Sequence, residues 1–207
     1  WVTYPELVVY SGGVPVFIET DESTEFKITA KQLKEKITPK TKILMLNSPS
    51  NPTGSIYSKD ELLAIGEVLK GTDIVVLSDE MYEKLIYKGK KFTATAEVSP
   101  DMYNRTVTIN GLSKSVAMTG WRFGYVACPN SALAKAMSKL QGQVTSNVNS
   151  MTQYAAIVAL EGEANKDIEM MRVEFEKRKD YAVKAINNIS KLSCYDPDGA
   201  FYLFINI

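Results

Sequence analysis

The sequence predicts an α/β protein in which a doubly wound, mostly parallel sheet lies between two layers of helices. Short apolar runs rich in β-branched residues recur along the chain, as buried strands do, and segments with helical periodicity separate several of them. Polar clusters follow three of these runs, at the strand ends where ligands bind in sheets of this class. We therefore expect a three-layer α/β/α fold with its functional site at the carboxyl ends of the strands.

Strands are expected at five apolar runs: Val14–Ile18, Ile43–Leu46, Ile74–Leu77, Thr106–Ile109 and Phe123–Ala127. The clearest helix begins after Ser58, because its hydroxyl can cap free backbone amides while Glu61 completes a capping box, and it ends at Gly71. Shorter helices are expected at residues 30–37, behind a capping threonine, and at residues 131–140.

The last quarter of the chain has a different pattern. Residues 149–160 are rich in alanine and apolar side chains, which predicts a buried helix. Residues 165–190 are charged and periodic, which suits a long exposed helix that spans two substructures, and Phe201–Ile207 is an alternating apolar run. We therefore place a domain boundary between residues 164 and 165.

Composition narrows the class of partner. The chain has 207 residues, of which 45% are hydrophobic and 23% charged, so it can bury a sizeable core. Lys and Arg together number 24, as do Asp and Glu, so no net charge draws the chain toward nucleic acid or an anionic membrane. No apolar run is long enough for a membrane span, and no secretion signal is recognisable. A small-molecule partner is expected.

Histidine is absent, and this limits the chemistry. A Ser-His-Asp triad, histidine-ligated zinc and a histidine general base are excluded within this chain, and we expect no metal. Cys128 and Cys194 have neither zinc-ligand spacing nor the density of a disulfide scaffold, and read as reduced, packed thiols of a cytoplasmic protein. Lysine, carboxylate, tyrosine or a cofactor must supply the chemistry.

Three charged residues in the polar clusters are candidates. Asp79 follows a buried strand, where a carboxylate needs a cationic partner unless it caps a helix. Lys114, among small residues after another strand, could act as an amine nucleophile toward a carbonyl, or could be a solvated surface lysine. Arg122, between aromatic residues, suits a bidentate phosphate contact or a structural ion pair.

Two further groups complete the set. Asn51 belongs to the run Asn51-Pro52-Thr53-Gly54, which alone could be only a turn, and Tyr82 follows Asp79 closely. Together the clusters describe a ligand with an aldehyde, a pyridine nitrogen, a phenolic oxygen and a phosphate, and pyridoxal phosphate has all four.

In its motifs the chain resembles the class I and II aminotransferases among the fold-type I pyridoxal-phosphate enzymes. Within that family, its motifs are most similar to those of aspartate aminotransferases. The matching text is "WVTYPELV", "NSPSNPTG", "VVLSDEMYE" and "SKSVAMTGWRFGYVACP", in the family's order and approximate spacing. The resemblance implies a large cofactor-binding domain in residues 1–164, followed in 165–207 by a linking helix and the start of a small α+β domain.

The resemblance also implies roles for single residues. Lys114 matches the lysine that forms the internal Schiff base and then acts as general base and acid. Asp79 matches the carboxylate that keeps the pyridine nitrogen protonated. Asn51 and Tyr82 match the groups that hydrogen-bond the phenolic oxygen. Gly111 stands where some relatives have a phosphate-binding serine.

Arg122 matches the arginine that binds the cofactor's phosphate, and Trp1 matches the aromatic residue that stacks on its ring. The implied reaction transfers an amino group from an amino acid, with aspartate as the first candidate, to a 2-oxo acid such as 2-oxoglutarate. Residues 145–147 resemble a loop that crosses into the partner's site in a homodimer, with an ordinary interhelical loop as the alternative.

Family members are roughly twice as long, so we expect this chain to be a piece of a longer protein. We expect the piece by itself to be inactive. The phosphate-cupping loop and the arginine for the substrate α-carboxylate are not in it. Two other functions remain open. One is a β-lyase of the same fold, which acts on substrates such as cystathionine, and the other is a non-catalytic binding or regulatory domain.

Overall fold

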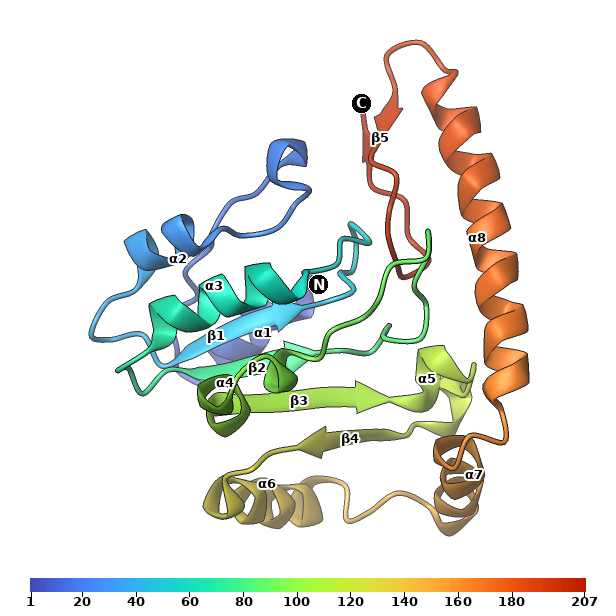
Figure 1. Ribbon diagram of the computed structural model, residues 1–207. Helices are drawn as coiled ribbons and strands as arrows, with labels where there is room; N and C mark the ends of the chain where they lie inside the picture. The colour runs from blue at the N-terminus through green and yellow to red at the C-terminus, as the bar shows by residue number, and fades with distance from the viewer.

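The computed structural model describes residues 1–207 and is built around a four-stranded sheet (Figure 1). Its strands are β1 (Ile43–Asn47), β2 (Val75–Asp79), β3 (Thr106–Gly111) and β4 (Gly124–Ala127), in that spatial order. The first three strands run parallel, and β4 is antiparallel to β3. The predicted mostly parallel sheet is confirmed.

The register of the parallel strands brings their carboxyl ends to one level. Asn47 of β1 pairs with Asp79 of β2, and Asp79 pairs in turn with Ile109 of β3. The segments that leave β1, β2 and β3 therefore begin side by side at one edge of the sheet, which is the edge that the sequence predicts for a site.

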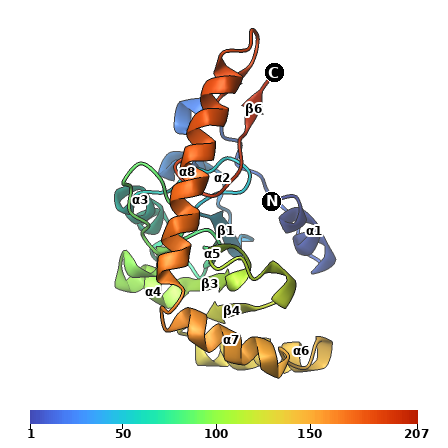
Figure 2. The ribbon, with the colours of Figure 1, turned by 90° about the vertical axis from the view of Figure 1, so that its right-hand side faces the viewer.

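Helices cover both faces of this sheet. The α-helices are α1 (Thr3–Tyr10), α2 (Ala30–Lys36), α3 (Lys59–Leu69), α4 (Pro100–Arg105), α5 (Leu112–Ser115), α6 (Ser131–Val144), α7 (Ser150–Leu160) and α8 (Asn165–Asn187). Short 3-10 turns lie at Glu22–Thr24, Thr95–Glu97 and Thr119–Trp121. Figures 1 and 2 show α3 and α4 on one face and α1 on the other, so the predicted three layers are confirmed.

The main core lies between the sheet and α3. Ser58 accepts a hydrogen bond from the Glu61 backbone nitrogen and Glu61 answers with its carboxylate, so the predicted capping box is present. The apolar stripe of α3 then packs on β1 and β2 together with α2 and α4. The buried cluster comprises Leu33, Leu46, Tyr57, Leu62, Ile65, Leu69, Ile74, Val76, Val98 and Met102.

Two predictions about single elements are wrong. The run Val14–Ile18 forms no strand, because no other strand lies beside it and Val14, Val16 and Phe17 are exposed. The helix at residues 149–160 forms as α7 but is not buried. Only Thr152 and Ala156 of α7 are buried, while Tyr154 is 75% exposed. An apolar composition predicted burial, but the structure places only one side of α7 against other residues.

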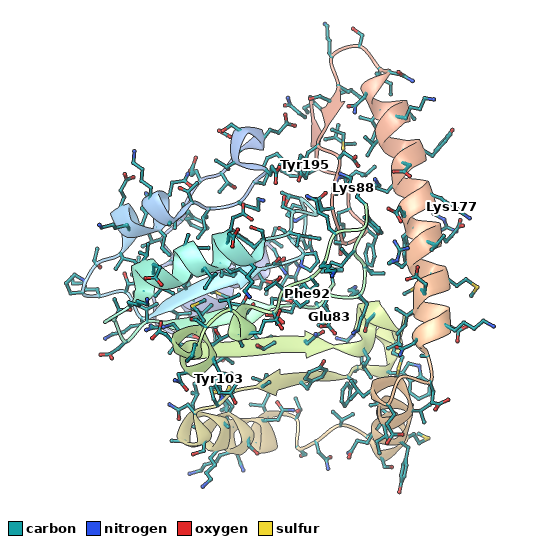
Figure 3. All side chains as sticks on the ribbon, in the orientation of Figure 1. Glu83, Lys88, Phe92, Tyr103, Lys177 and Tyr195 are labelled. Atoms are coloured by element: carbon teal, nitrogen blue, oxygen red, sulfur yellow. The ribbon has the colours of Figure 1, made fainter.

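The long helix predicted in residues 165–190 forms as α8, which ends at Asn187, and it leads to a C-terminal segment that returns along the body. The segment forms a two-stranded ribbon from β5 (Ser193–Cys194) and β6 (Ile205–Asn206), so only part of the run Phe201–Ile207 is a strand. Figure 3 shows Lys177 pointing outward from α8, whereas Lys88 of the loop after β2 and Tyr195 of the C-terminal segment lie on the side of α8 that faces the body. None of the helices has both the length and the apolar character to cross a membrane.

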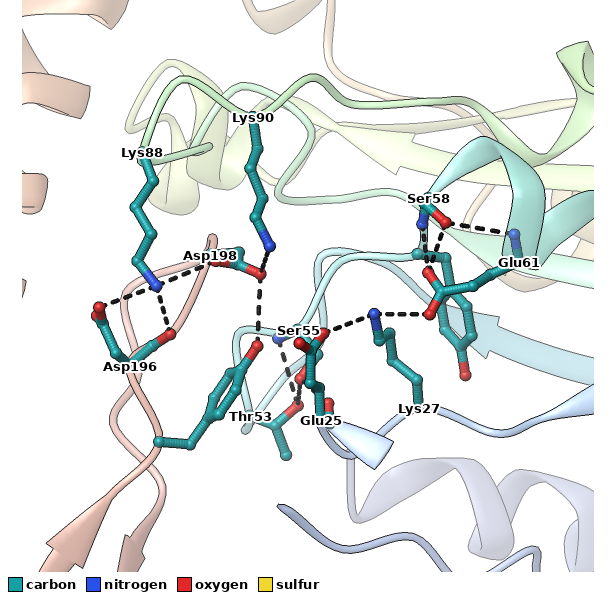
Figure 4. A network of polar contacts seen from close by, with 12 residues as sticks. Glu25, Lys27, Thr53, Ser55, Ser58, Glu61, Lys88, Lys90, Asp196 and Asp198 are labelled. Atoms are coloured by element: carbon teal, nitrogen blue, oxygen red, sulfur yellow. Dashed lines mark hydrogen bonds and ion pairs between the residues drawn. The ribbon is translucent and has the colours of Figure 1, made fainter. Parts of the chain in front are cut away.

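Charged side chains fasten the C-terminal segment to the body. Asp198, only 2% exposed, pairs with Lys90 and, at 3.1 Å, with Lys88 (Figure 4). Lys88 also pairs with Asp196 at 2.9 Å. The backbone nitrogens of Asp198 and Gly199 donate to the Gly54 carbonyl at 3.1 and 2.9 Å. The residues that follow Gly199 are thereby held against the loops after β1 and β2.

Candidate active site

Asp79, the last residue of β2, is bound by groups from three other segments. Its carbonyl accepts from the Asn47 side chain at 3.1 Å, which joins the end of β1 to the end of β2. Its carboxylate accepts from the Met81 backbone nitrogen at 3.1 Å and from the Tyr4 hydroxyl at 2.5 Å. The predicted cationic partner is therefore replaced by neutral donors, and no helix begins at Asp79 that it could cap.

Tyr4 reaches Asp79 from α1. Burial, followed by the hydrogen bond to Asp79, raises the pKa of the Tyr4 hydroxyl, so it remains a proton donor throughout the neutral range. A carboxylate has about four lone-pair positions. With one oxygen on Met81 and the other on Tyr4, Asp79 keeps capacity for a further donor.

Tyr82 follows Asp79 by three residues and is 4% exposed. Its hydroxyl lies 2.7 Å from the hydroxyl of Tyr202, which the C-terminal segment supplies. Burial raises the pKa of Tyr82, the contact with Tyr202 and the charge of Asp79 raise it further, and a hydrogen bond from Asn51 opposes the rise. The two residues expected to share one oxygen of the cofactor, Asn51 and Tyr82, are thus neighbours.

Lys114 lies in α5, the single helical turn directly after β3, and is half-buried. Its amine makes no hydrogen bond or ion pair in the structure, and its nearest described partner is the ring of Phe201, 5.6 Å from the nitrogen. An aromatic face attracts a cation without neutralising it. This is not the solvated surface lysine of the alternative reading.

Gly111 explains one departure from the expected motif. A Cβ at this position would lie 2.7 Å from the Phe123 carbonyl oxygen and 3.1 Å from Gly124 Cα, both in backbone that cannot move aside easily. The close approach of β4 therefore requires glycine where some relatives have serine. The neighbouring Ser113 instead accepts a hydrogen bond at its carbonyl from the Thr119 hydroxyl, at 2.7 Å.

Arg122 follows the 3-10 turn Thr119–Trp121 and has a left-handed backbone with φ of 57°. Its guanidinium donates to the Thr119 carbonyl at 2.8 Å, is exposed and forms no ion pair. The alternative reading of Arg122 as a structural ion pair is therefore wrong. Four of its five N–H donors have no protein acceptor and can receive an anion.

Trp1 lies two residues before the start of α1 and is 55% exposed. Its backbone nitrogen donates to the Asn51 carbonyl at 3.2 Å, and its ring meets the Tyr4 ring edge-on with centroids 5.6 Å apart. An aromatic ring held by α1 beside the Asn51 loop has a face left over for another planar group.

Contacts connect all six predicted site residues. Trp1 touches Asn51 and Tyr4, and Tyr4 holds Asp79. Tyr82 packs edge-on against Phe201 at 5.4 Å, and Phe201 in turn faces Lys114. Arg122 is joined to the Lys114 turn through Thr119 and Ser113.

The sequence analysis missed three members of this cluster: Tyr4, Phe201 and Tyr202. Tyr4 had a usable signal, because it lies three residues after Trp1 in the motif and in the first turn of α1, close enough for the two rings to meet. Phe201 and Tyr202 had none. They lie about 120 residues from Tyr82 along the chain, and only the folded backbone brings them to it.

A lysine, a carboxylate, two phenols and an arginine without an ion-pair partner lie together at the edge of the sheet where the parallel strands end. This arrangement is typical of α/β domains that bind a small charged ligand. The family model "Aminotransferase class I and II" matches residues 1–207. The chain belongs to the class I and II aminotransferase family.

Individual relatives agree with this assignment. The chain is 50% identical over 206 residues to an aspartate aminotransferase of Geobacillus stearothermophilus, covering 100% of this chain and 52% of that protein. Among solved structures, an aspartate aminotransferase from Rhizobium meliloti matches with a TM-score of 0.95 at 42% identity, covering 99% of this chain and 51% of that one. An aromatic aminotransferase from Pyrococcus horikoshii OT3 matches with the same TM-score at 39% identity, covering 100% and 55%.

The chain spans about half the length of the curated relatives it matches. The expectation that family members are roughly twice as long is therefore confirmed.

Proposed function

We propose that this chain is the cofactor-binding part of a pyridoxal-phosphate-dependent aminotransferase. The observation that carries the proposal is the pair of cations, Lys114 and Arg122, which have no carboxylate partner yet belong to the same contact network as Asp79. A half-buried cation such as Lys114 usually has a partner, and the absence of one is typical of a site that receives a ligand, whereas the exposed Arg122 contributes N–H donors that no protein group uses.

The donors present fit pyridoxal phosphate group by group. Arg122 has free N–H donors for the phosphate, and Asp79 has an acceptor position left for a protonated ring nitrogen. Tyr82 and Asn51 supply polar hydrogens for the phenolic oxygen, and Trp1 has a free ring face. Lys114 has a primary amine that makes no hydrogen bond or ion pair with another residue.

The cofactor would supply an aldehyde and a ring able to accept the electron pair released at the substrate's α-carbon. Lys114 would hold it through Nζ and, when the substrate takes that place, carry a proton on the freed amine. The negative charge of Asp79 would keep the ring nitrogen protonated, and Tyr4 would orient that carboxylate. Arg122 would anchor the phosphate and so fix the ring's position.

The substrates proposed are an amino acid, with aspartate first, and a 2-oxo acid such as 2-oxoglutarate. Relatives named aspartate aminotransferase support this choice, while a 46% identical relative from Streptococcus mutans, covering 100% of this chain and 52% of that protein, is named an asparagine–oxo-acid transaminase. The division at residue 164, into a cofactor-binding domain and a linking helix with the start of a small domain, belongs to the same proposal.

We also propose a homodimer located in the cytoplasm. Exposed apolar side chains on two helices suit a surface that another chain covers, namely Leu7, Val9 and Tyr10 of α1 and Met151, Tyr154 and Val158 of α7. Both cysteines are free thiols, as is usual in a reducing compartment.

The decisive experiment is to add pyridoxal phosphate, reduce with borohydride and locate the pyridoxyl group by mass spectrometry. It is done on the 207-residue chain and on a chimera in which residues 1–207 replace the matching half of the Geobacillus stearothermophilus relative, with that relative as positive control. Label at Lys114, lost in Lys114→Ala but kept in Lys184→Ala, supports the proposal.

An unlabelled chimera beside a labelled relative would refute the cofactor role. The labelled chimera is then given aspartate and 2-oxoglutarate. Formation of glutamate supports amino-group transfer, whereas ammonia and pyruvate released from cystathionine would replace it with the β-lyase reaction.

A further inference from the structure

The hydroxyl groups of Tyr82 and Tyr202 form a contact that the proposed roles leave unexplained. Tyr82 comes from the loop after β2 and Tyr202 from the C-terminal segment, yet their oxygens lie 2.7 Å apart and their rings meet edge-on at 5.7 Å. A hydrogen bond between a buried and a half-buried phenol needs both rings to be fixed, since either hydroxyl can otherwise rotate to another partner.

The surrounding backbone fixes both rings. The Ala200 nitrogen donates to the Leu85 carbonyl at 2.9 Å, and Gly199 forms a β-bridge with Ile86. The Tyr87 hydroxyl donates to the Ala200 carbonyl. The two segments are therefore joined on the residues just before Tyr202 and just after Tyr82, which leaves the pair little freedom to separate.

Phe201 adds a second link between this segment and the site. It packs on Tyr82 at 5.4 Å and on Phe175 of α8 at 5.3 Å, and it faces the Lys114 amine. Two consecutive residues of the C-terminal segment thus touch two different residues of the proposed cofactor site.

We propose that Tyr202 is a positioning residue for Tyr82, holding its hydroxyl at the place where it would meet the phenolic oxygen of the cofactor. The inference rests on the proposed function.

The direction of the hydrogen bond follows from the number of protons. A phenol has one proton, so Tyr82 can donate it to Tyr202 or to a cofactor oxygen, not to both. Without a cofactor, either hydroxyl can donate to the other, and the contact with Tyr202 adds to burial in raising the Tyr82 pKa. With an acceptor beside Tyr82, the contact persists only when Tyr202 becomes the donor, which strengthens Tyr82 as a donor in turn.

The groups that act on Tyr82 are few. Beyond burial, which is the largest cause of the raised Tyr82 pKa, Tyr202 raises it through the shared hydrogen bond, Asp79 raises it by its charge, and Asn51 lowers it. Removal of the Tyr202 hydroxyl alone should therefore be visible in the titration of Tyr82, because the other two groups stay in place.

The test uses Tyr202→Phe, which keeps the ring and removes only the hydroxyl. Tyr125→Phe is the matched control, because Tyr125 is also half-buried and its hydroxyl has no hydrogen-bond partner in the structure. In the cofactor-free 207-residue chain, NMR of carbon-13-labelled tyrosine follows the ionisation of Tyr82, assigned with Tyr82→Phe. We expect Tyr82 to titrate at lower pH in Tyr202→Phe and to be unchanged in the control.

The second readout is the pH midpoint of the bound cofactor's visible absorbance in the chimera. A weaker Tyr82 donor leaves more negative charge on the phenolic oxygen beside the nitrogen of Lys114, so that nitrogen keeps its proton to higher pH. We expect the midpoint of Tyr202→Phe to rise by about half a unit, the scale of one neutral hydrogen bond. A role in packing alone would not move this midpoint.

The failures are distinguishable. A Tyr202→Phe chimera that carries pyridoxyl on Lys114 but has the wild-type midpoint overturns this inference and leaves the proposed function intact. An unchanged Tyr82 titration in the cofactor-free chain also overturns it. A wild-type chimera without label on Lys114 overturns the proposed function and this inference together.

Discussion

The substitution Gly54→Ala should destabilise the protein more than any other glycine substitution of similar backbone conformation. Gly54 has φ of +72°, in the left-handed region, and ends the motif Asn51-Pro52-Thr53-Gly54. A Cβ there would lie 2.3 Å from Pro197 Cβ and 2.7 Å from the Gly199 carbonyl oxygen. Both neighbours belong to the C-terminal segment, whose Asp198 and Gly199 amides donate to the Gly54 carbonyl. The new methyl group therefore pushes apart two backbones that hydrogen bonds hold together.

The magnitude can be separated into two parts. The left-handed backbone costs about 1–2 kcal/mol once a Cβ is present. Overpacking against atoms that cannot retreat adds about 1–3 kcal/mol. Gly71 supplies the control, because it has nearly the same φ of +73° but open space around its absent Cβ. Gly71→Ala should show the first part only, so the difference between the two variants measures the steric contact.

Urea unfolding of wild type and both variants gives the free energies, with unchanged m-values as the condition for comparing them. Hydrogen exchange at the Asp198 and Gly199 amides should quicken in Gly54→Ala and stay as in wild type in Gly71→Ala. Equal free-energy losses in the two variants would refute the reasoning, since they would show that the contact with Pro197 and Gly199 does not oppose a side chain.

Three further predictions concern single contacts. Burial raises the pKa of Tyr57 to about 12, above the 10.0 of an unfolded tyrosine, so its share of stability is complete below pH 10 and about 3 kcal/mol is lost as pH rises to 12. Tyr57→Phe loses the hydroxyl that accepts the Ile28 amide at 2.9 Å, so it should be less stable than wild type at pH 8; because it has no phenol to ionise, it should also lose less stability by pH 11, and parallel curves would contradict this. Arg105 forms a bidentate pair with Asp101 and also donates to the Ile74 carbonyl at 2.8 Å. Arg105→Lys should therefore lower the free energy of unfolding, measured in urea, by about 1–3 kcal/mol. The control Arg178→Lys, at an exposed site, should change it by less than about 0.5 kcal/mol. Asp79→Asn in the chimera should keep the pyridoxyl label on Lys114 but reduce glutamate formation about 100-fold or more, and undiminished turnover would exclude the role proposed for Asp79.

The parts of the fold that sequence predicts well are those with a local cause. The helix after Ser58 has a capping box and an apolar stripe within a dozen residues, and both are present in the structure. The strands β1, β2 and β3 contain short runs of apolar and β-branched residues, as is usual where helices cover both faces of a sheet.

The parts of the fold that are predicted poorly from sequence depend on tertiary contacts with segments that lie far away along the chain. Residues 14–18 read as a strand, but a strand needs a partner, and none is adjacent. The helix α7 reads as buried, but burial depends on which elements surround it. For the site, motif text indicated Lys114, Asp79 and Arg122, whereas the hydroxyl of Tyr4 on Asp79 and that of Tyr202 on Tyr82 follow from tertiary placement alone.

The loop that contains Gly54 connects these two kinds of information. Its motif is readable in the sequence because the text Asn51-Pro52-Thr53-Gly54 resembles that of the family, yet Gly54 is needed for another reason, the close approach of Pro197 and Gly199. The same approach brings Ala200 to Leu85 and hence Tyr202 to Tyr82. A change at Gly54 that loosens the C-terminal segment should therefore also weaken the hydroxyl pair. The tyrosine titration shift expected for Tyr202→Phe should then reappear, in smaller degree, in Gly54→Ala and not in Gly71→Ala.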